Sequence, residues 1–411
     1  MCIMMSIAVF QTAFGQGAEG CDQAGRYLLP VFSQVQQTNV VYGSNRTANG
    51  QNRVLSMDIF EPVGDAAAAR PVIIWVHGGS FIFGSRTDMR VFAETYARLG
   101  YVTASIDYRL FPISLGIPDS TKALDAAIKA VGDLKAAVRH LRRDAETDNR
   151  FRIDPDRILI GGLSAGAITA VHAAYLSEDD DIPAHVQAIV DANGGIHGST
   201  GDSINRTYSS EVLGVISMSG AIYDERWISA SDPPLVSFHA KDDDVVPYYD
   251  DFARIGGLNI IRLKGSGIMY ERAEDIGLSN YHLGPDAGGH NELYTSPAYE
   301  AERLEFTAGA TAFVRELICD QPVSLGARAL REPAIFPVPA NEGVRVDLGS
   351  EFTGQSVLQL YDLAGRLLTT VPAQGAEVFI PRGDIPAGMY ILRVETGTGA
   401  EQFAPARLLF R

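Results

Sequence analysis

A nine-residue stretch constrains the fold of this chain more than any other part of the sequence. An apolar run (residues 158–160, ILI) leads directly into residues 161–166 (GGLSAG), and an Ala-rich segment follows. This order predicts a buried strand, a very sharp turn and the start of a helix, with Ser164 held in a strained backbone conformation. Its Oγ would project at the end of a sheet, where a nucleophile must stand. The alternative is an ordinary turn that happens to match a short pattern.

The two glycines around this serine fit the same interpretation. A side chain at Gly162 or Gly166 would collide with the neighbouring strand or helix, so a tight turn requires small residues there. The backbone N–H of Ala165 would then point to the place where negative charge develops on a substrate oxygen.

The first 319 residues alternate between apolar strands and amphipathic helices. Such alternation predicts an α/β fold with a mostly parallel sheet and helices on both faces. The predicted strands are residues 54–62, 71–76, 101–108, 157–160, 212–218, 234–238 and 259–263, and the predicted helices are residues 89–99, 120–143, 164–176 and 298–317. The first strand alternates well enough for an antiparallel edge strand. Residues 177–211 form a polar, Gly-rich insertion whose role stays open.

The character of the sequence changes after Cys319. Residues 320–335 are predicted to be an irregular linker, and residues 344–348, 357–361 and 389–394 are short alternating strands. These strands predict a small all-β sandwich over residues 336–411, separate from an α/β domain over residues 16–319.

The N-terminal segment has the composition of an export signal. Residues 2–14 are mostly apolar and uncharged, and they end in Ala13-Phe14-Gly15, a small-x-small cleavage pattern. We predict a cleaved signal peptide over residues 1–15, although the usual basic region is missing. The alternative is a disordered or buried N-terminal segment.

The cysteines are consistent with export. The chain has three, and removal of the signal removes Cys2 and leaves Cys21 and Cys319 near the two ends of the α/β domain. A Cys21–Cys319 disulfide would join these ends in an oxidising compartment. Two unrelated buried thiols are the alternative, because sequence alone does not bring them together.

Charge excludes two classes of partner. The chain has 34 Lys plus Arg against 50 Asp plus Glu, a net charge of −16. Such a surface repels nucleic acid and anionic membranes. No apolar run in the body of the chain reaches the roughly 18 residues of a membrane span.

A serine nucleophile needs a base and an acid, and the sequence offers candidates for both. The strand at residues 234–238 leads into residues 239–247 (HAKDDDVVP). Asp243 is the preferred acid because it occupies the acidic position of a His-x-x-x-Asp-x-x-Val-Pro pattern. Asp242 and Asp244 are then solvated neighbours, and His239 is expected to cap or pack at the start of the loop.

The base is expected in a later loop. The strand at residues 260–263 should precede it, and residues 284–293 contain Gly288-Gly289-His290, where small residues let the loop approach the nucleophile. His290 is therefore the preferred base, and His282 is the competing candidate.

Residues 77–80 (HGGS) follow another buried strand. Backbone N–H groups of Gly79 and Ser80, together with that of Ala165, can converge on an oxyanion if no side chain obstructs them. A plain Gly-rich strand exit is the alternative.

Several of these motifs together carry a family resemblance. Residues 73–84 (IIWVHGGSFIFG), 107–110 (DYRL) and 162–166 (GLSAG), with the two later loops, resemble the carboxylesterase branch of the α/β-hydrolase superfamily, which includes hormone-sensitive-lipase-like and feruloyl-esterase-like enzymes. The resemblance covers roughly residues 25–319. Ser80 stands where many relatives have a third glycine. The resemblance implies an acyl-enzyme mechanism that uses Ser164 and needs no metal or organic cofactor.

The tail carries a second resemblance. Residues 336–340 (FPVPA), 360–366 (LYDLAGR) and 385–390 (IPAGMY) resemble the C-terminal sorting domain of type IX secretion, although the opening motif matches imperfectly. This resemblance implies export to the cell surface or beyond, with the secretion machinery as a partner. A carbohydrate-binding or adhesive β-domain is the alternative.

The sequence therefore predicts a secreted serine carboxylic-ester hydrolase acting on small or plant-wall-type esters, such as acetyl or feruloyl esters. A serine peptidase on the same fold and a non-catalytic adhesion protein are the alternatives. Phe81, Phe83 and Trp227 are candidates for a substrate pocket, but core packing explains them equally well.

Overall fold

The computed structural model describes residues 17–319, 334–336, 340–348, 355–362, 366–396 and 406–410. The predicted signal peptide (residues 1–15), Cys2 and most of the predicted linker (residues 320–335) lie outside the described residues. The chain divides into two compact units, which hold nearly all residues up to 321 and those from 322 onwards. The proposed domain boundaries at 319–320 and 335–336 stay predictions.

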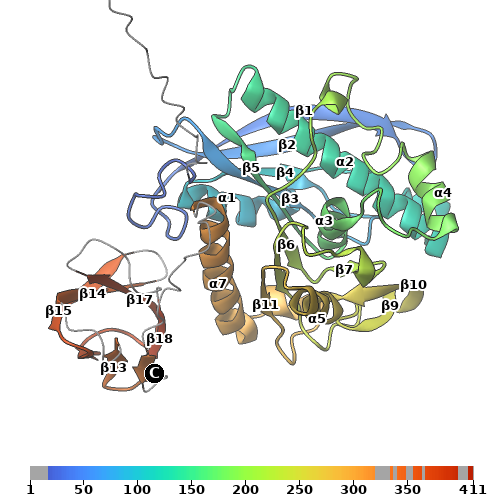
Figure 1. The fold of residues 1–411 in the computed structure, drawn as a ribbon. Coiled ribbons are helices and arrows are strands. Elements are labelled where there is room, and N and C mark those ends of the chain that lie inside the picture. Colours follow the sequence, from blue (N-terminus) through green and yellow to red (C-terminus); the bar gives the residue numbers. More distant parts are fainter. Residues whose placement is uncertain are drawn as a thin grey trace, which may run out of the picture. The chain divides into compact units, whose positions relative to one another are not determined.

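The larger unit is built on an eight-stranded sheet with the order β1-β2-β4-β3-β5-β6-β8-β11 (Figure 1). The strands from β4 to β11 in this order run parallel, and β1 and β2 are antiparallel additions at one side. The strands are β1 (Val35–Arg46), β2 (Asn52–Pro62), β3 (Arg70–Val76), β4 (Val102–Ile106), β5 (Ile153–Leu163), β6 (Gly214–Met218), β8 (Leu235–Phe238) and β11 (Asn280–Leu283). This is the mostly parallel sheet that the sequence predicts.

Helices cover both faces of this sheet, with α1 and α7 on one face and α2 and α3 on the other (Figure 1). The helices are α1 (Arg90–Leu99), α2 (Ser120–Glu146), α3 (Ala165–Tyr175), α4 (Ala184–Ala192), α5 (Ser266–Ile276), α6 (Glu292–Thr295) and α7 (Glu300–Cys319). None of the helices in the described part of the chain is long and apolar enough to cross a membrane.

Strand β3 shows why the apolar runs occupy the centre. Val72, Ile74 and Val76 pack into the core under α2 and α3, whereas Ile73 and Trp75 pack into the core under α1 and α7. A strand buried on both faces needs a continuous apolar run, because neither set of alternating side chains meets water.

Two predicted strands have other positions than expected. Residues 54–62 form an inner strand, because β1 pairs with the other side of β2 and is itself the edge. Residues 259–263 belong to β10 (Leu258–Gly265), which lies outside the central sheet and pairs antiparallel with β9 (Asp250–Ile255) and β7 (Ala221–Ile222). The strand that precedes the His290 loop is therefore β11, with only four residues.

The insertion at residues 177–211 is partly helical. It contains α4, which buries Val186 and Val190 in the same core as α2. This insertion is therefore packed onto the domain, and it is not a separate subdomain of its own.

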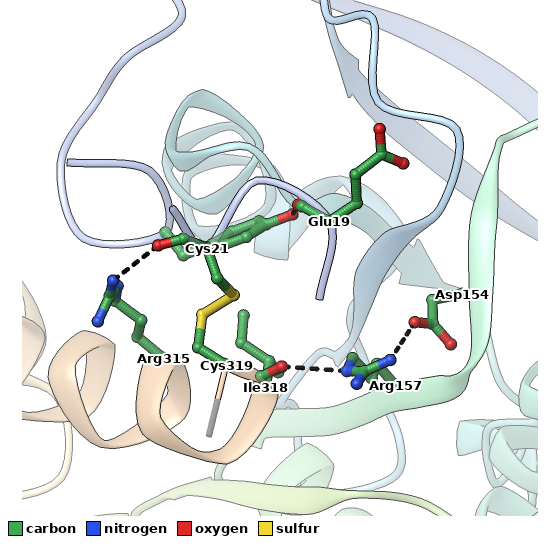
Figure 2. The surroundings of a disulfide bond; sticks show 8 residues. Glu19, Cys21, Asp154, Arg157, Arg315, Ile318 and Cys319 are labelled. Carbon is green, nitrogen blue, oxygen red and sulfur yellow. Dashed lines mark hydrogen bonds and ion pairs between the residues drawn. A yellow bond between two sulfur atoms is a disulfide. The ribbon is translucent and has the colours of Figure 1, made fainter. Parts of the chain in front are cut away.

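Cys21 and Cys319 form a disulfide between segments 298 residues apart in sequence (Figure 2). The surrounding backbone is also tied down, since Arg315 donates to the carbonyl of Cys21 at 3.0 Å and Arg157 donates to the carbonyl of Ile318 at 3.0 Å. The end of α7 is thus joined both to the N-terminal segment and to the beginning of β5.

The smaller unit consists of two antiparallel sheets around one apolar core. The first sheet contains β12 (Ala334–Phe336), β13 (Gly343–Asp347) and β16 (Glu377–Pro381), and the second contains β14 (Gln355–Tyr361), β15 (Leu367–Gln374), β17 (Gly388–Thr396) and β18 (Ala406–Phe410). All three strands predicted in this region are present.

Candidate active site

Ser164 lies between β5 and α3 with φ 56° and ψ −121°, a backbone conformation that residues with a side chain rarely adopt. Its N–H donates to the carbonyl of Met218 on the adjacent strand at 2.8 Å. A Cβ at Gly162 would lie 2.3 Å from the carbonyl carbon of Gly166, and a Cβ at Gly166 would lie 2.0 Å from the carbonyl oxygen of Val76. Both positions require glycine, and the turn presents the serine at its apex.

Three side chains that are far apart in the sequence meet beside this turn. His290 Nε2 lies 2.9 Å from Ser164 Oγ, and His290 Nδ1 lies 2.7 Å from Asp243 Oδ2. Asp243 comes from the loop after β8, and His290 comes from the loop after β11. A hydroxyl, an imidazole and a carboxylate in series are the groups that a serine nucleophile, its base and an orienting acid require.

The Asp243 carboxylate is fully buried and accepts several hydrogen bonds. Oδ1 accepts the N–H groups of Val245 and Val246, each at 2.9 Å, while Oδ2 faces both His290 and His239. Burial alone would raise the pKa of this carboxyl, but the hydrogen bonds and charge of His239 and His290 hold that pKa well below its usual range. Asp243 is therefore a charged acceptor for His290.

His239 is a second histidine on the same carboxylate, whereas the sequence predicts only that it caps or packs at the start of the loop. It is fully buried, with Nε2 at 3.1 Å from both Asp243 Oδ2 and the carbonyl of Val246. Its Nδ1 lies 3.0 Å from the hydroxyl of Ser266 in α5. The spacing His-x-x-x-Asp at the end of a strand was the available signal for this contact.

The neighbouring aspartates are exposed, but one of them has a structural contact. Asp242 Oδ1 accepts the N–H of Gly289 at 2.8 Å. The loop after β8, which carries Asp243, is therefore bound directly to the loop after β11, which carries His290. Asp242 is thus more than the solvated neighbour that the sequence predicts, whereas Asp244 lies exposed beside Asp243.

His282 lies on β11 and is not brought to the nucleophile. Its Nδ1 lies 2.6 Å from the hydroxyl of Ser237, and its Nε2 lies 2.8 Å from the hydroxyl of Tyr248. Burial lowers the pKa of His282 to about 4, so the ring is neutral near pH 7. Its contacts are those of a packed structural histidine.

The loop after β3 folds closely over the elbow. A Cβ at Gly78 would lie only 3.2 Å from the Cβ of Ser164. Gly79, Ser80 and Phe81 follow with φ values of 112°, 54° and 61°. Two successive non-glycine residues in the left-handed region are unusual, and such strain gathers at functional sites.

This loop leaves backbone donors unpaired. Among the described residues, no acceptor receives the N–H of Gly79 or of Ser80. Ala165 is the first residue of α3, where the N–H has no intrahelical partner. We propose that these three amides stabilise an oxyanion beside Ser164.

A pocket opens next to Ser164. Of the three aromatic candidates, only Phe81 lines it. The side chain of Phe83 is exposed, and Trp227 is buried, where it stacks on Tyr223 at 5.5 Å. No cluster of three or more potential metal ligands occurs in the part of the chain that the structure describes.

Comparison with protein families accounts for both units. The BD-FAE family model matches residues 57–251, and the model of the secretion system C-terminal sorting domain matches residues 334–403. The chain carries a BD-FAE esterase domain. This match confirms the resemblance to esterase-family hydrolases, and the BD-FAE match contains Ser164 and Asp243 but ends before His290. The sorting domain confirms the second resemblance and indicates a secreted or cell-surface protein.

Individual proteins that the chain resembles include a lipase and a hydrolase. Lipase 1 of Geotrichum candidum is 33% identical over 127 residues, which are 29% of this chain and 21% of the lipase. Phenmedipham hydrolase of Pseudarthrobacter oxydans is 34% identical over 116 residues, which are 28% of this chain and 21% of that hydrolase. The chain thus spans about a fifth of the length of these relatives.

Solved structures include esterase 2 of Thermogutta terrifontis with bound butyrate. It is 19% identical to this chain and has a TM-score of 0.49, covering 70% of this chain and 96% of the esterase. The same esterase with bound propionate is 20% identical, with a TM-score of 0.48 over the same shares of both chains.

Proposed function

We propose that the protein is a secreted serine carboxylic-ester hydrolase that acts through an acyl-enzyme on small or plant-wall-type esters, such as acetyl and feruloyl esters. The observation that supports this most strongly is the continuous line of hydrogen-bonding groups from Ser164 through His290 to Asp243, with separations of 2.9 and 2.7 Å. Such a line activates a serine hydroxyl that is otherwise a weak nucleophile.

In this mechanism Ser164 Oγ attacks the ester carbonyl, and His290 Nε2 takes the hydroxyl proton. The charged Asp243 carboxylate orients the imidazole and stabilises the imidazolium. The oxyanion is held by the amides of Gly79, Ser80 and Ala165, and loss of one such donor typically raises the barrier by roughly 3–4 kcal/mol. His290 then donates its proton to the leaving alcohol, and water hydrolyses the acyl-enzyme by the same route in reverse.

Replacing the nucleophile tests the proposal. We expect Ser164→Ala to lower kcat for 4-nitrophenyl acetate by on the order of 10⁶-fold, because the acyl-enzyme no longer forms. The Tm of this variant should stay close to that of the wild type, since the substitution removes one hydroxyl. Ester hydrolysis retained in Ser164→Ala would exclude the mechanism.

Labelling and substrate choice separate the alternatives. A fluorophosphonate should label the wild type and leave Ser164→Ala unlabelled, whereas a non-catalytic adhesion protein would not react in either form. A serine peptidase would cleave aminoacyl-nitroanilides as well as nitrophenyl esters, whereas we expect this protein to cleave the esters and to leave the nitroanilides intact.

A further inference from the structure

The pocket beside Ser164 has an unusual wall. Thirteen of its eighteen lining residues are apolar, and one side is supplied by the β9–β10 hairpin rather than by the central sheet. The apolar hairpin residues that line the pocket are Ala253, Ile255, Ile260, Ile261 and Leu263. Ala123, Leu124 and Ala127 in the first turns of α2 (Ser120–Glu146) also line the pocket.

The polar side chains in the lining already have partners. His172 Nδ1 lies 2.7 Å from the carbonyl of Ile168, and its Nε2 accepts the N–H of Tyr223 at 3.1 Å. The Tyr223 hydroxyl lies 3.1 Å from His185, and the Arg254 guanidinium donates to side chains of its own hairpin. Away from the two serines at the reaction centre, the described lining therefore offers a ligand little besides hydrocarbon.

The position of the pocket indicates which part of an ester enters it. Its lining includes Ser164, Ser80 and Ala165 but not His290. The leaving alcohol must receive its proton from His290, so that alcohol lies on the histidine side of the nucleophile. Because the pocket is lined by Ser164 and two of the proposed oxyanion donors, the acyl group rather than the alcohol would enter it.

We propose that the β9–β10 hairpin makes the enzyme selective for esters of aliphatic acids several methylenes long, an inference that rests on the proposed esterase function. Each methylene buried in such a pocket gains about 0.8 kcal/mol, or roughly fourfold in kcat/KM. A phenolic acyl group is disfavoured, because its hydroxyl would lose water without gaining a partner. Within the range of esters proposed above, feruloyl esters are therefore expected to be hydrolysed with a lower kcat/KM than plain aliphatic esters.

The hairpin is fixed to the catalytic loop, so the pocket is preformed. Arg254 in β9 donates its N–H to the carbonyl of Val245, two residues after Asp243, at 2.8 Å. At the end of β10, a Cβ on Gly265 would lie 1.8 Å from the carbonyl oxygen of Pro247. A wall attached in this way keeps its shape without a ligand and holds the acyl chain in one place relative to the acid loop.

A chain-length series tests the inference. For 4-nitrophenyl acetate, butyrate, hexanoate and octanoate, we expect the wild-type kcat/KM to rise by about fourfold per methylene until the pocket is filled. Ala253→Phe should fill the pocket and lower the ratio of the hexanoate to the acetate kcat/KM at least tenfold. Leu258→Phe is the matched control, because Leu258 lies on the same hairpin but is exposed and does not line the pocket.

A second substrate pair needs no variant. Methyl cinnamate and methyl 4-hydroxycinnamate differ by one hydroxyl, and we expect the wild type to prefer the cinnamate by about tenfold. A wild type that hydrolyses acetate but shows no rise with chain length, or that prefers the hydroxylated ester, overturns the inference and leaves the esterase function standing. A wild type that hydrolyses none of these esters overturns both.

Discussion

The parallel strands of the central sheet have a carboxyl end and an amino end, and the loops at these two ends, here called the two edges of the sheet, differ in kind. At the edge where the parallel strands end lie Ser164, Asp243 and His290, in loops with left-handed backbone and unpaired amides. At the edge where those strands begin, buried charges are paired. Arg70 lies 2.7 Å from Glu61, Arg26 lies 2.7 Å from Asp65, and the Cys21–Cys319 disulfide closes the same region.

This difference separates reactivity from stability. Strained backbone costs of the order of 1–3 kcal/mol per residue, and the unpaired donors gain a partner only when substrate arrives. At the opposite edge, a disulfide and ion pairs whose side chains are at most 8% exposed stabilise the fold and offset this cost in conformational energy. Substitutions at the first edge should therefore change activity, and substitutions at the second should change stability.

Among the substitutions that test this comparison, Asp243→Asn is expected to have the largest effect. An amide favours the wrong tautomer of His290 and does not stabilise the imidazolium, so kcat should fall by roughly 10⁴-fold. Thermal unfolding should show that the variant is still folded at the assay temperature, because the amide oxygen can still accept the N–H groups of Val245 and Val246. The measurement is kcat for 4-nitrophenyl acetate together with Tm.

Asp244→Asn is the matched control, one residue away and exposed. It should keep wild-type kcat. If Asp244→Asn lost activity and Asp243→Asn kept it, Asp243 would not be the acid of the triad. The assignment of activity to the edge that carries Asp243 would then lose its support.

The disulfide gives the next effect. The disulfide constrains a very long loop of the unfolded chain. The double variant Cys21→Ser, Cys319→Ser should therefore have a free energy of unfolding lower by about 4 kcal/mol, which corresponds to a Tm lower by roughly 8 °C. Its kcat/KM at 25 °C should equal that of the wild type. Dithiothreitol should lower the Tm of the wild type and not that of the double variant, and a change in kcat/KM would contradict the separation of the two edges.

Much of the fold could be predicted because its signals are local. The apolar runs give the central strands, and Gly100 ends α1 with φ 111°, as a glycine after a helical pattern predicts. Strand β1 could not be predicted, because most of its residues are exposed and its sequence (VQQTNVVYGSNR) does not alternate. Strand β11 has four half-buried residues, and β10 was assigned to the wrong sheet because strand pairing is a long-range property.

The candidate site shows the same division. The candidate residues each stand in a local sequence motif (Gly79, Ser80, Ser164, Ala165, Asp243 and His290). Glycines at fixed offsets mark all of them except Asp243, whose signal is the His-x-x-x-Asp-x-x-Val-Pro pattern. The contact of His239 with Asp243 lies within one loop, and the His-x-x-x-Asp spacing is a local signal for it. The contact of Asp242 with Gly289 joins two loops that are far apart in sequence, so no local pattern predicts it. The apolar pocket wall depends on the placement of the β9–β10 hairpin, which no local pattern specifies.

The smallest effect is expected at the stabilising edge, for Asp65→Asn. Burial alone would raise the pKa of Asp65, but hydrogen bonds from Arg26 and from the N–H of Ala67, and the charge of Arg70, lower it below its usual value. An unfolded chain protonates this carboxyl near pH 3.9. The stabilisation is therefore complete above that pH and is lost as the pH falls through the lower folded-state pKa.

We expect Asp65→Asn to destabilise the protein by roughly 3 kcal/mol at pH 7, because Arg26 is left buried with a neutral partner. Its Tm should also change less than that of the wild type between pH 5 and pH 3, since the variant has no carboxyl to protonate there. Asp148→Asn, at an exposed position, is the control and should follow the wild-type curve. A kcat/KM for Asp65→Asn well below that of the wild type at pH 7 and 25 °C would mean that this edge also positions the triad, and the two edges would then be coupled through the strands that join them.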